Sequence, residues 1–274
     1  MHNIITDQLK THFHARAATY ASAHPEQDTT MWPFKNKKSL LQLGVMDGLA
    51  DHHSHILPGV DDGMRTMADS LAALRRYRQE GVSRLWLTPH IMEDYPNTTP
   101  DLRRRFDELL TAYRAEEGDD TMQLHLAAEH MLDTLFARRL SEHDLLTLDG
   151  KNTLLVETSY FNPPAGLYRL LEEIMHNGYR IVLAHPERYM YMNSDDYARL
   201  HDMGVVMQLN LPSVAGAYGQ EAAARAESLL KKNYYGLAGT DIHSLRGTLA
   251  FMNRPIKASV ATRILELTNR QNTH

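Results

Sequence analysis

From about residue 47 onward, segments with apolar residues at helical spacing alternate with short, continuous apolar runs. Apolar residues recur at helical spacing over residues 67–74, Gly81 ends that helix, and the short apolar run "SRLWLTPH" follows. The same order recurs around Gly178, before "YRIVLAHPER", and around Gly204, before "VVMQLN". A glycine just after a helix readily adopts the left-handed C-cap conformation, and the apolar runs are short enough to be strands. The pattern therefore predicts repeated helix and strand units.

Other segments extend this pattern. Further strands are predicted at "QLHLAAE", "TLLVE" and "GLAGT", with helices over residues 102–113 and 167–175 and near the C-terminus. Because no hairpin signal joins the strands, we expect them to be parallel, in an α/β barrel or an open sheet. Residues 1–45 lack the pattern, which predicts an N-terminal extension over 1–45, flexible relative to a single domain over 46–274.

Composition and charge narrow the class of protein. Of 274 residues, 43% are hydrophobic and 23% charged, and no apolar run approaches the ~18 residues of a membrane span. The net charge of -5 provides no basic stripe for nucleic acid, and the run Arg103, Arg104 and Arg105 is interpreted as a solvated helix face. The N-terminus has no secretory pattern, so we expect a cytoplasmic location. The absence of cysteine excludes disulfides, thiolate metal sites and a cysteine nucleophile.

Residues with metal-binding side chains follow almost every predicted strand. They are His53, His55, His90, Glu129, Glu157, His185, Asp241 and His243. The carboxyl ends of parallel strands hold the chemistry of α/β folds, and Glu129, Glu157 and His185 are each 28 residues apart, the length of one repeat unit. Each residue alone has an ordinary interpretation as a strand end, helix cap or turn. Their joint recurrence favours one functional site.

The residue types indicate a site for several metal ions. His53 and His55 lie two apart on an extended segment and point to the same side, and Asp241 and His243 repeat this arrangement. With Asp62, the set has five imidazoles and four carboxylates, which predicts three divalent ions that attract a phosphate and lower the pKa of a bound water. Nitrogen and oxygen ligands without sulfur suit manganese, iron or zinc; we expect manganese, with iron and zinc as alternatives.

Six motifs resemble, in order and spacing, those of the polymerase and histidinol phosphatase (PHP) family. They are "DHHSHILPGVDDG", "TPHI", "AAEH", "VETSY", "AHPERY" and "GTDIH", and the resemblance covers about residues 46–270. Within this family, the chain is most similar to bacterial metal-dependent protein-tyrosine phosphatases of capsule and exopolysaccharide operons. The resemblance implies a distorted (β/α)7 barrel related to the TIM barrel. It also implies a first ion on His53, His55, Glu129 and Asp241, a second on Glu129, Glu157 and His185, and a third on Asp62, His90 and His243.

The resemblance also implies a reaction and a substrate. Arg188 matches an arginine that engages the substrate phosphate, and the expected substrate is the phosphorylated tail of a bacterial tyrosine autokinase that governs polysaccharide export. Hydrolysis of the phosphomonoester needs no covalent phosphoenzyme. Asp61 is a candidate general acid for the leaving phenol, with a turn aspartate as its alternative. His52 departs from the family pattern and is predicted to point away from the ions. Because "MWPFKNKK" resembles a short leader of related proteins, Met31 is a candidate native start.

Other functions stay open at this point. A small-molecule phosphatase, for example one acting on histidinol phosphate, is the first alternative, followed by a phosphodiesterase and a metal-loaded binding module without turnover. Aromatic residues near the motifs line a cleft for a phenyl ring or pack in the core; they are Tyr160, Phe161, Tyr189 and Tyr191. The sequence does not determine the metal, the oligomeric state or the kinase.

Overall fold

A computed structural model describes residues 37–118 and 122–272, in which parallel strands form two sheets. Met31 lies outside the described residues. One sheet has the strand order β10-β9-β8-β7-β6-β4, and the other has the order β2-β3-β5. Their bounds are β2 (Ala50–Asp51), β3 (Arg84–Leu87), β4 (His90–Ile91), β5 (Gln123–Leu126), β6 (Glu129–Met131), β7 (Thr153–Glu157), β8 (Arg180–Ala184), β9 (Val206–Asn210) and β10 (Tyr235–Gly239).

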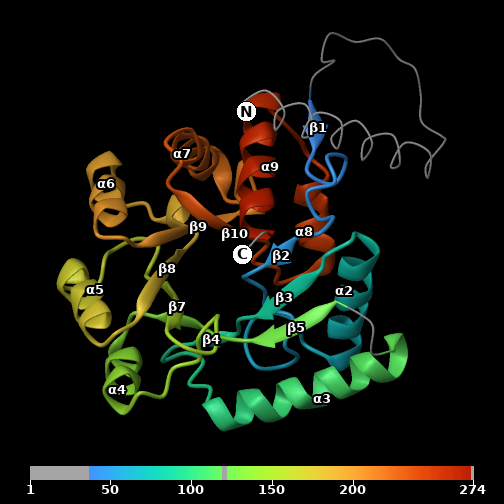
Figure 1. Cartoon of the computed structure of the whole chain (residues 1–274), viewed down its shortest axis with the longest axis horizontal. Helices are drawn as coiled ribbons and strands as arrows, with labels where there is room; N and C mark the ends of the chain where they lie inside the picture. Colours follow the sequence, from blue (N-terminus) through green and yellow to red (C-terminus); the bar gives the residue numbers. More distant parts are fainter. Residues whose placement is uncertain (1–36, 119–121, 273–274) are drawn as a thin grey trace, which may run out of the picture.

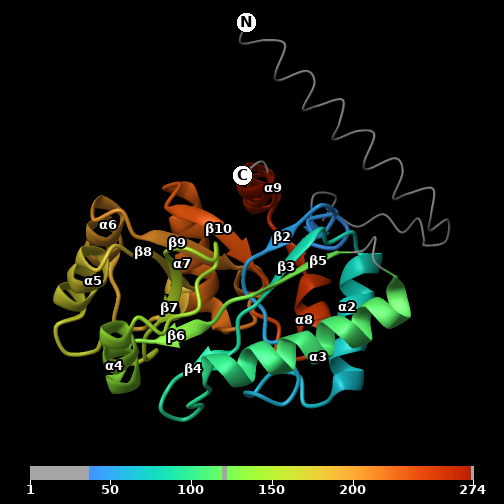
Figure 2. The ribbon, with the colours of Figure 1, turned by 60° about the horizontal axis from the view of Figure 1, so that its bottom comes forward.

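Helices surround these strands on the outside of the molecule (Figure 1). Those between the strands are α2 (Met67–Gln79), α3 (Thr99–Glu117), α4 (Thr134–Glu142), α5 (Leu167–His176), α6 (Ser194–Asp202) and α7 (Gly219–Lys231). The chain ends with α8 (Leu245–Met252) and α9 (Ala258–Asn272), and the short 3-10 helices η1 (Pro186–Arg188) and η2 (Leu211–Ala215) follow β8 and β9. Figure 2 shows α4, α5 and α6 together on one side and α2 and α3 on the other. None of the helices among the described residues is long and apolar enough to cross a membrane.

Two predicted strands are each interrupted in the middle, with their first part in one sheet and their second part in the other, so they connect the two sheets. "SRLWLTPH" forms β3 and β4, and "QLHLAAE" forms β5 and β6. At the other edge, β2 and β10 approach each other through a parallel bridge between Ser54 and Ile242. Over the described residues no continuous ladder joins β2 to β10, so the predicted mixed α/β fold with parallel strands is confirmed but a closed barrel is not found.

The C-terminal helix occupies the gap between β2 and β10. The side-chain amide of Gln271 donates to the carbonyl oxygens of Ala50 in β2 at 2.6 Å and Ala238 in β10 at 3.3 Å, and accepts from the Ala238 amide at 2.7 Å. Oδ1 of Asn272 accepts from the Ala50 amide at 2.9 Å. These contacts satisfy backbone groups that a closed sheet would have paired.

Small apolar side chains fill the space between the strands, and one large aromatic ring lies among them. Trp86 packs with Ala50, Ala127 and Ala184 in a buried cluster and donates to a backbone oxygen. The His52 ring stacks on Trp86 at 4.2 Å between centroids, so the prediction that His52 points away from the ligand residues is confirmed.

The packed part of the chain begins earlier than the predicted boundary at residue 46. β1 (Lys38–Ser39) pairs antiparallel with β11 (Pro255–Ile256), and Leu40 and Leu41 are buried in the main core. Residues 38–45 therefore belong to the folded domain rather than to an extension. The Arg103, Arg104 and Arg105 run does lie on a helix, α3, where Arg104 pairs with acidic neighbours at the surface.

Candidate metal centre

The predicted ligands come together where the parallel strands end. His90 and Glu129 are the first residues of β4 and β6 and are direct neighbours in the register of the sheet. Glu157 is the last residue of β7, His185 follows β8, and Asp241 lies just beyond β10. All five side chains are buried. The fold therefore brings these five side chains together: Glu157, His185 and Asp241 lie at the carboxyl ends of their strands, and the other two lie where β3 and β5 pass into β4 and β6.

Two histidines after β2 direct their ring nitrogens at each other. His53 donates from Nδ1 to Oε1 of Gln208 at 2.9 Å, and His55 donates from Nδ1 to Asp61 at 2.8 Å. A neutral imidazole that carries its proton on Nδ1 has a lone pair on Nε2. The two Nε2 atoms lie 3.2 Å apart. Two lone pairs at this distance require a cation or a proton beside them.

Two carboxylate oxygens join these nitrogens. Oε2 of Glu129 lies 3.1 Å from Nε2 of His53 and 3.3 Å from Nε2 of His55. Oδ1 of Asp241 lies 3.4 Å from both nitrogens. Both oxygens are buried without a hydrogen-bond partner, and the four atoms lie within 4.8 Å of one another. Buried acceptors that face each other with no donor between them fit a divalent cation.

Protons are the competing way to satisfy these acceptors. Burial lowers the pKa of His53, but the Glu129 and Asp241 carboxylates outweigh it and raise that pKa above its ordinary value. The pKa of His55 is raised in the same way, with Asp61 as the largest contributor against burial. Burial raises the pKa of Glu129, but His53 and His90 reverse the shift and hold it well below the ordinary value. A cation that binds at this site would therefore displace protons.

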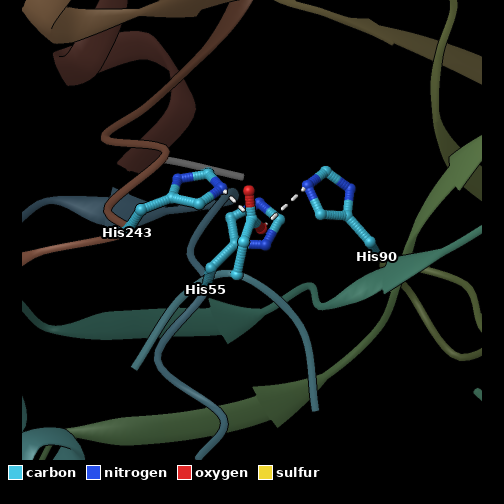
Figure 3. Close-up of side chains that lie close together, drawn as sticks. His55, His90 and His243 are labelled. Atoms are coloured by element: carbon cyan, nitrogen blue, oxygen red, sulfur yellow. Dashed lines mark ion pairs between the residues drawn. The ribbon is translucent and has the colours of Figure 1, made fainter. Parts of the chain in front are cut away.

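A second group of candidate ligands lies on the exposed side of the centre. It contains His55, Asp62, His90 and His243, again within 4.8 Å. Oδ1 of Asp62 lies 3.5 Å from Nε2 of His90 and 3.3 Å from Nε2 of His243. Figure 3 shows the three imidazoles turned toward one region, with His55 between the other two. Asp62 is exposed, which leaves this group accessible from solvent.

A third group contains His90, Glu129 and Glu157. Nδ1 of His90 lies 3.1 Å from Glu129 and 3.0 Å from Glu157. His185 is adjacent, with Nε2 at 2.9 Å from Glu129 and 3.9 Å from Glu157. All nine predicted ligand residues thus lie in one connected cluster, and Glu129 belongs to two of its three groups.

Asp61 lies behind His55 rather than at the open side of the centre. Its carboxylate accepts from Nδ1 of His55, from the His90 amide at 3.0 Å and from the Gly63 amide at 2.9 Å. Burial raises the pKa of Asp61, but His55 outweighs it and lowers the pKa to about 2. This geometry argues against the predicted general-acid role and favours orientation of the His55 ring. Gly63 is required because a Cβ there would lie 2.1 Å from the His55 carbonyl oxygen.

Strand β9, which carries no predicted ligand, supplies contacts to the ligand side chains that the sequence did not predict. Besides the bond from His53 to Gln208 in β9, Nδ2 of Asn210 donates to Oδ2 of Asp241 at 2.7 Å. Both side chains are buried at alternate positions of an otherwise apolar strand, which is the only sequence signal for their role. Such contacts fix the orientation of ligand side chains.

Backbone strain accompanies two of the ligand residues. His185 has φ 33° and Asp241 has φ 51°, in the left-handed region that residues other than glycine rarely adopt. Each such residue costs about 1–3 kcal/mol and persists where surrounding contacts determine it. The strain turns both side chains sharply off the ends of β8 and β10.

Arg188 lies at the edge of the centre, at the end of η1. Its Nη1 donates to Oδ2 of Asp241 at 2.7 Å, and its side chain is 15% exposed. The guanidinium carbon lies 4.3 Å from the ring centroid of Tyr160 and 4.0 Å from that of Tyr218. The arginine, which is expected to engage the substrate phosphate, therefore contacts a predicted ligand, Asp241.

The other aromatic residues divide between core and surface. Tyr189 is buried, and its hydroxyl accepts from the Thr158 amide, while the Tyr191 hydroxyl contacts the Thr158 hydroxyl. Phe161 is 68% exposed. Tyr160 and Tyr189 both lie beside the His185 ring, with centroids 5.8 and 5.9 Å away, and the Tyr160 hydroxyl also lies 3.5 Å from Oε2 of Glu157.

Comparison with known proteins gives one consistent group of relatives. The tyrosine-protein phosphatase YwqE of Bacillus subtilis is 27% identical over 201 residues, which cover 72% of this chain and 78% of YwqE. The tyrosine-protein phosphatase CpsB of Streptococcus pneumoniae is 26% identical over 215 residues, which cover 75% of this chain and 87% of CpsB.

A solved structure gives the same result. It comes from work on YwqE of B. subtilis and CpsB of S. pneumoniae, described as unique metal-dependent tyrosine phosphatases. It superimposes with a TM-score of 0.68 at 26% identity, over 80% of this chain and 86% of that chain. In addition, residues 49–261 match the family described as "Capsular polysaccharide synthesis, CpsB/CapC". The chain belongs to the CpsB/CapC family of capsular polysaccharide synthesis.

Proposed function

We propose that this protein is a metal-dependent protein-tyrosine phosphatase that hydrolyses phosphate monoesters of tyrosine. One observation carries the proposal: four buried acceptor atoms of His53, His55, Glu129 and Asp241 face each other without a donor, directly beside Arg188. The relatives named above are tyrosine phosphatases, which supports the same reaction here.

The cluster has enough ligands for three divalent ions. We assign the first to His53, His55, Glu129 and Asp241, the second to Glu129, Glu157 and His185, and the third to Asp62, His90 and His243. Nitrogen and oxygen ligands suit manganese, with iron or zinc as alternatives. When bound, such ions polarise phosphoryl oxygens and lower the pKa of a coordinated water.

The chain's own side chains orient the substrate and the ligands. A guanidinium donates paired hydrogen bonds to phosphoryl oxygens, so we assign Arg188 to hold the phosphate beside the centre. Asp61 keeps the proton of His55 on Nδ1 and directs Nε2 at the centre. The buried ligand carboxylates exclude bulk water from the inner side of the centre. The substrate approaches from the opposite side, where Asp62 is exposed.

We infer that the protein substrate is the phosphorylated tail of a bacterial tyrosine autokinase in capsule or exopolysaccharide synthesis. The family's role in capsular polysaccharide synthesis supports this assignment. We also infer that the two sheets form the distorted (β/α)7 barrel, which the bridge between Ser54 and Ile242 supports.

A substrate panel tests the proposed function. Manganese-loaded protein is given a phosphotyrosine peptide, the matched phosphoserine peptide, histidinol phosphate and a phosphodiester at equal concentration. The phosphotyrosine peptide should have the highest kcat/KM, because the relatives of this chain are tyrosine-protein phosphatases. Faster hydrolysis of histidinol phosphate would replace the proposal with the small-molecule phosphatase, and faster hydrolysis of the diester with a phosphodiesterase.

A further inference from the structure

The Arg188 guanidinium lies between two tyrosine rings that the reaction described above does not use. Tyr160 lies in the loop after β7, and Tyr218 immediately precedes α7, so the two rings come from separate parts of the chain. Their centroids are 4.3 and 4.0 Å from the guanidinium carbon. Both distances are within the ~6 Å range in which a cation is attracted to an aromatic face.

A third contact fixes the direction of the guanidinium. Nη1 of Arg188 donates to Oδ2 of Asp241 at 2.7 Å. The Tyr218 hydroxyl lies 3.4 Å from the same oxygen and accepts from Nδ2 of Asn210 at 3.3 Å. Both rings and the Asp241 carboxylate thus contact the guanidinium, and together these contacts restrict the orientation of its remaining N–H groups.

Exposure distinguishes Tyr218 from a core residue. It is 39% exposed and is one of four large hydrophobic residues that are exposed among the described residues. An arginine side chain has many rotamers, and restricting them before substrate binds removes an entropic cost of binding phosphate.

We propose that Tyr160 and Tyr218 are positioning residues that hold Arg188 with one edge on Asp241 and its other donors toward the substrate phosphoryl group. The inference rests on the proposed phosphatase function. It goes further by assigning the source of the arginine's orientation to two aromatic rings. Neither tyrosine needs to contact the reacting atoms.

The chain contains a matched control at the surface. The guanidinium carbon of Arg199 in α6 lies 3.6 Å from the ring centroid of Tyr168 in α5, and the Tyr168 hydroxyl donates to Asp196. This pair has the same chemistry, but it connects two outer helices. Tyr168→Leu therefore measures the general effect of removing a ring from an arginine.

The test compares leucine and phenylalanine at each tyrosine, with and without Arg188→Ala. For each variant we would measure metal content, thermal unfolding, kcat and KM on a phosphotyrosine peptide, and the affinity of inorganic phosphate for the manganese-loaded protein. Tyr218→Leu and Tyr160→Leu should each lower kcat/KM about 10-fold, the scale of one cation–π contact, and weaken phosphate binding in parallel. The phenylalanine variants keep the ring and should stay within about 3-fold of wild type. Tyr168→Leu should match wild type.

The Arg188→Ala background separates positioning from a general structural role. If the rings act through Arg188, Tyr218→Leu should cause less than about 2-fold further loss once the arginine is absent. A full 10-fold loss in that background, wild-type phosphate affinity in folded leucine variants, or an equal loss in Tyr168→Leu would each overturn the proposal. If wild-type protein binds phosphate in a ring-dependent way but does not hydrolyse phosphotyrosine, the proposed function fails while the positioning role stands.

Discussion

Glu129 is the residue whose replacement should affect the centre most, because it is the one carboxylate in the three ligand groups of the described residues that belongs to two of them. Its side chain is 1% exposed, Oε2 faces His53 and His55, and Oε1 lies 2.9 Å from His185. Glu129→Gln preserves the shape but removes one negative charge and turns one oxygen into a donor group. Two unit charges about 4 Å apart interact by ~4 kcal/mol at an effective dielectric constant of ~20, and a divalent ion doubles this interaction. The variant should therefore bind the ions that contact Glu129 at least about 10³-fold more weakly.

Elemental analysis after dialysis, manganese titration and hydrolysis of a phosphotyrosine peptide together measure this effect. Glu187→Gln is the matched control, because Glu187 is also fully buried but bonds to the Asn210 amide at 3.0 Å and the Tyr235 hydroxyl at 2.8 Å. The control should keep the metal content of wild type. A folded Glu129→Gln protein with wild-type metal content and turnover would refute the bridging role.

Three further predictions concern the surroundings of the centre. Asp61→Ala removes the acceptor that orients His55 and should weaken manganese binding about 10- to 100-fold in protein verified to be folded. An unchanged metal affinity would argue against the orienting role. Gln271→Leu leaves backbone groups of β2 and β10 without partners and should lower the free energy of unfolding by about 2 kcal/mol in urea titrations; an unchanged free energy would mean that α9 does not hold these strands together. Burial and His55 lower the pKa of His90, but Glu129 and Glu157 outweigh them and raise it to about 10, so ion-free His90 is protonated at neutral pH. Manganese affinity should therefore rise from pH 6 to 9 with proton release into weak buffer, and a pH-independent affinity would contradict this.

The sequence identified residues that the structure brings together, because they follow strands in a repeating order. Strand ends are local features, and parallel strands bring them to one edge wherever the register is regular. Residue spacing could not predict the supporting contacts. Gln208 is 155 residues from His53, and a glutamine in an apolar strand gives no indication of its partner. The orientation of Asp61 behind His55 likewise depends on the tight turn at Gly63.

The errors in the predicted fold also have physical causes. β1 is two residues long and is stabilised by pairing with β11 near the other end of the chain, so no local pattern marks the start of the domain. Helix α7 was not predicted because its sequence, "GQEAAARAESLLK", is rich in alanine and has large apolar residues only in its last turn. Two apolar runs that each read as one strand are divided in the structure, one into β3 and β4 and the other into β5 and β6. The apolar runs alone do not indicate this division, which separates the two sheets.

The central claim is that bound divalent ions, held by this cluster, carry out the hydrolysis of phosphotyrosine. The most direct test is to strip the protein with a chelator, verify by elemental analysis that it is free of metal, and measure the release of phosphate from a phosphotyrosine peptide before and after manganese is restored. We expect no hydrolysis by the stripped protein and recovery in proportion to the manganese bound. Full activity in protein verified to be free of metal would contradict it.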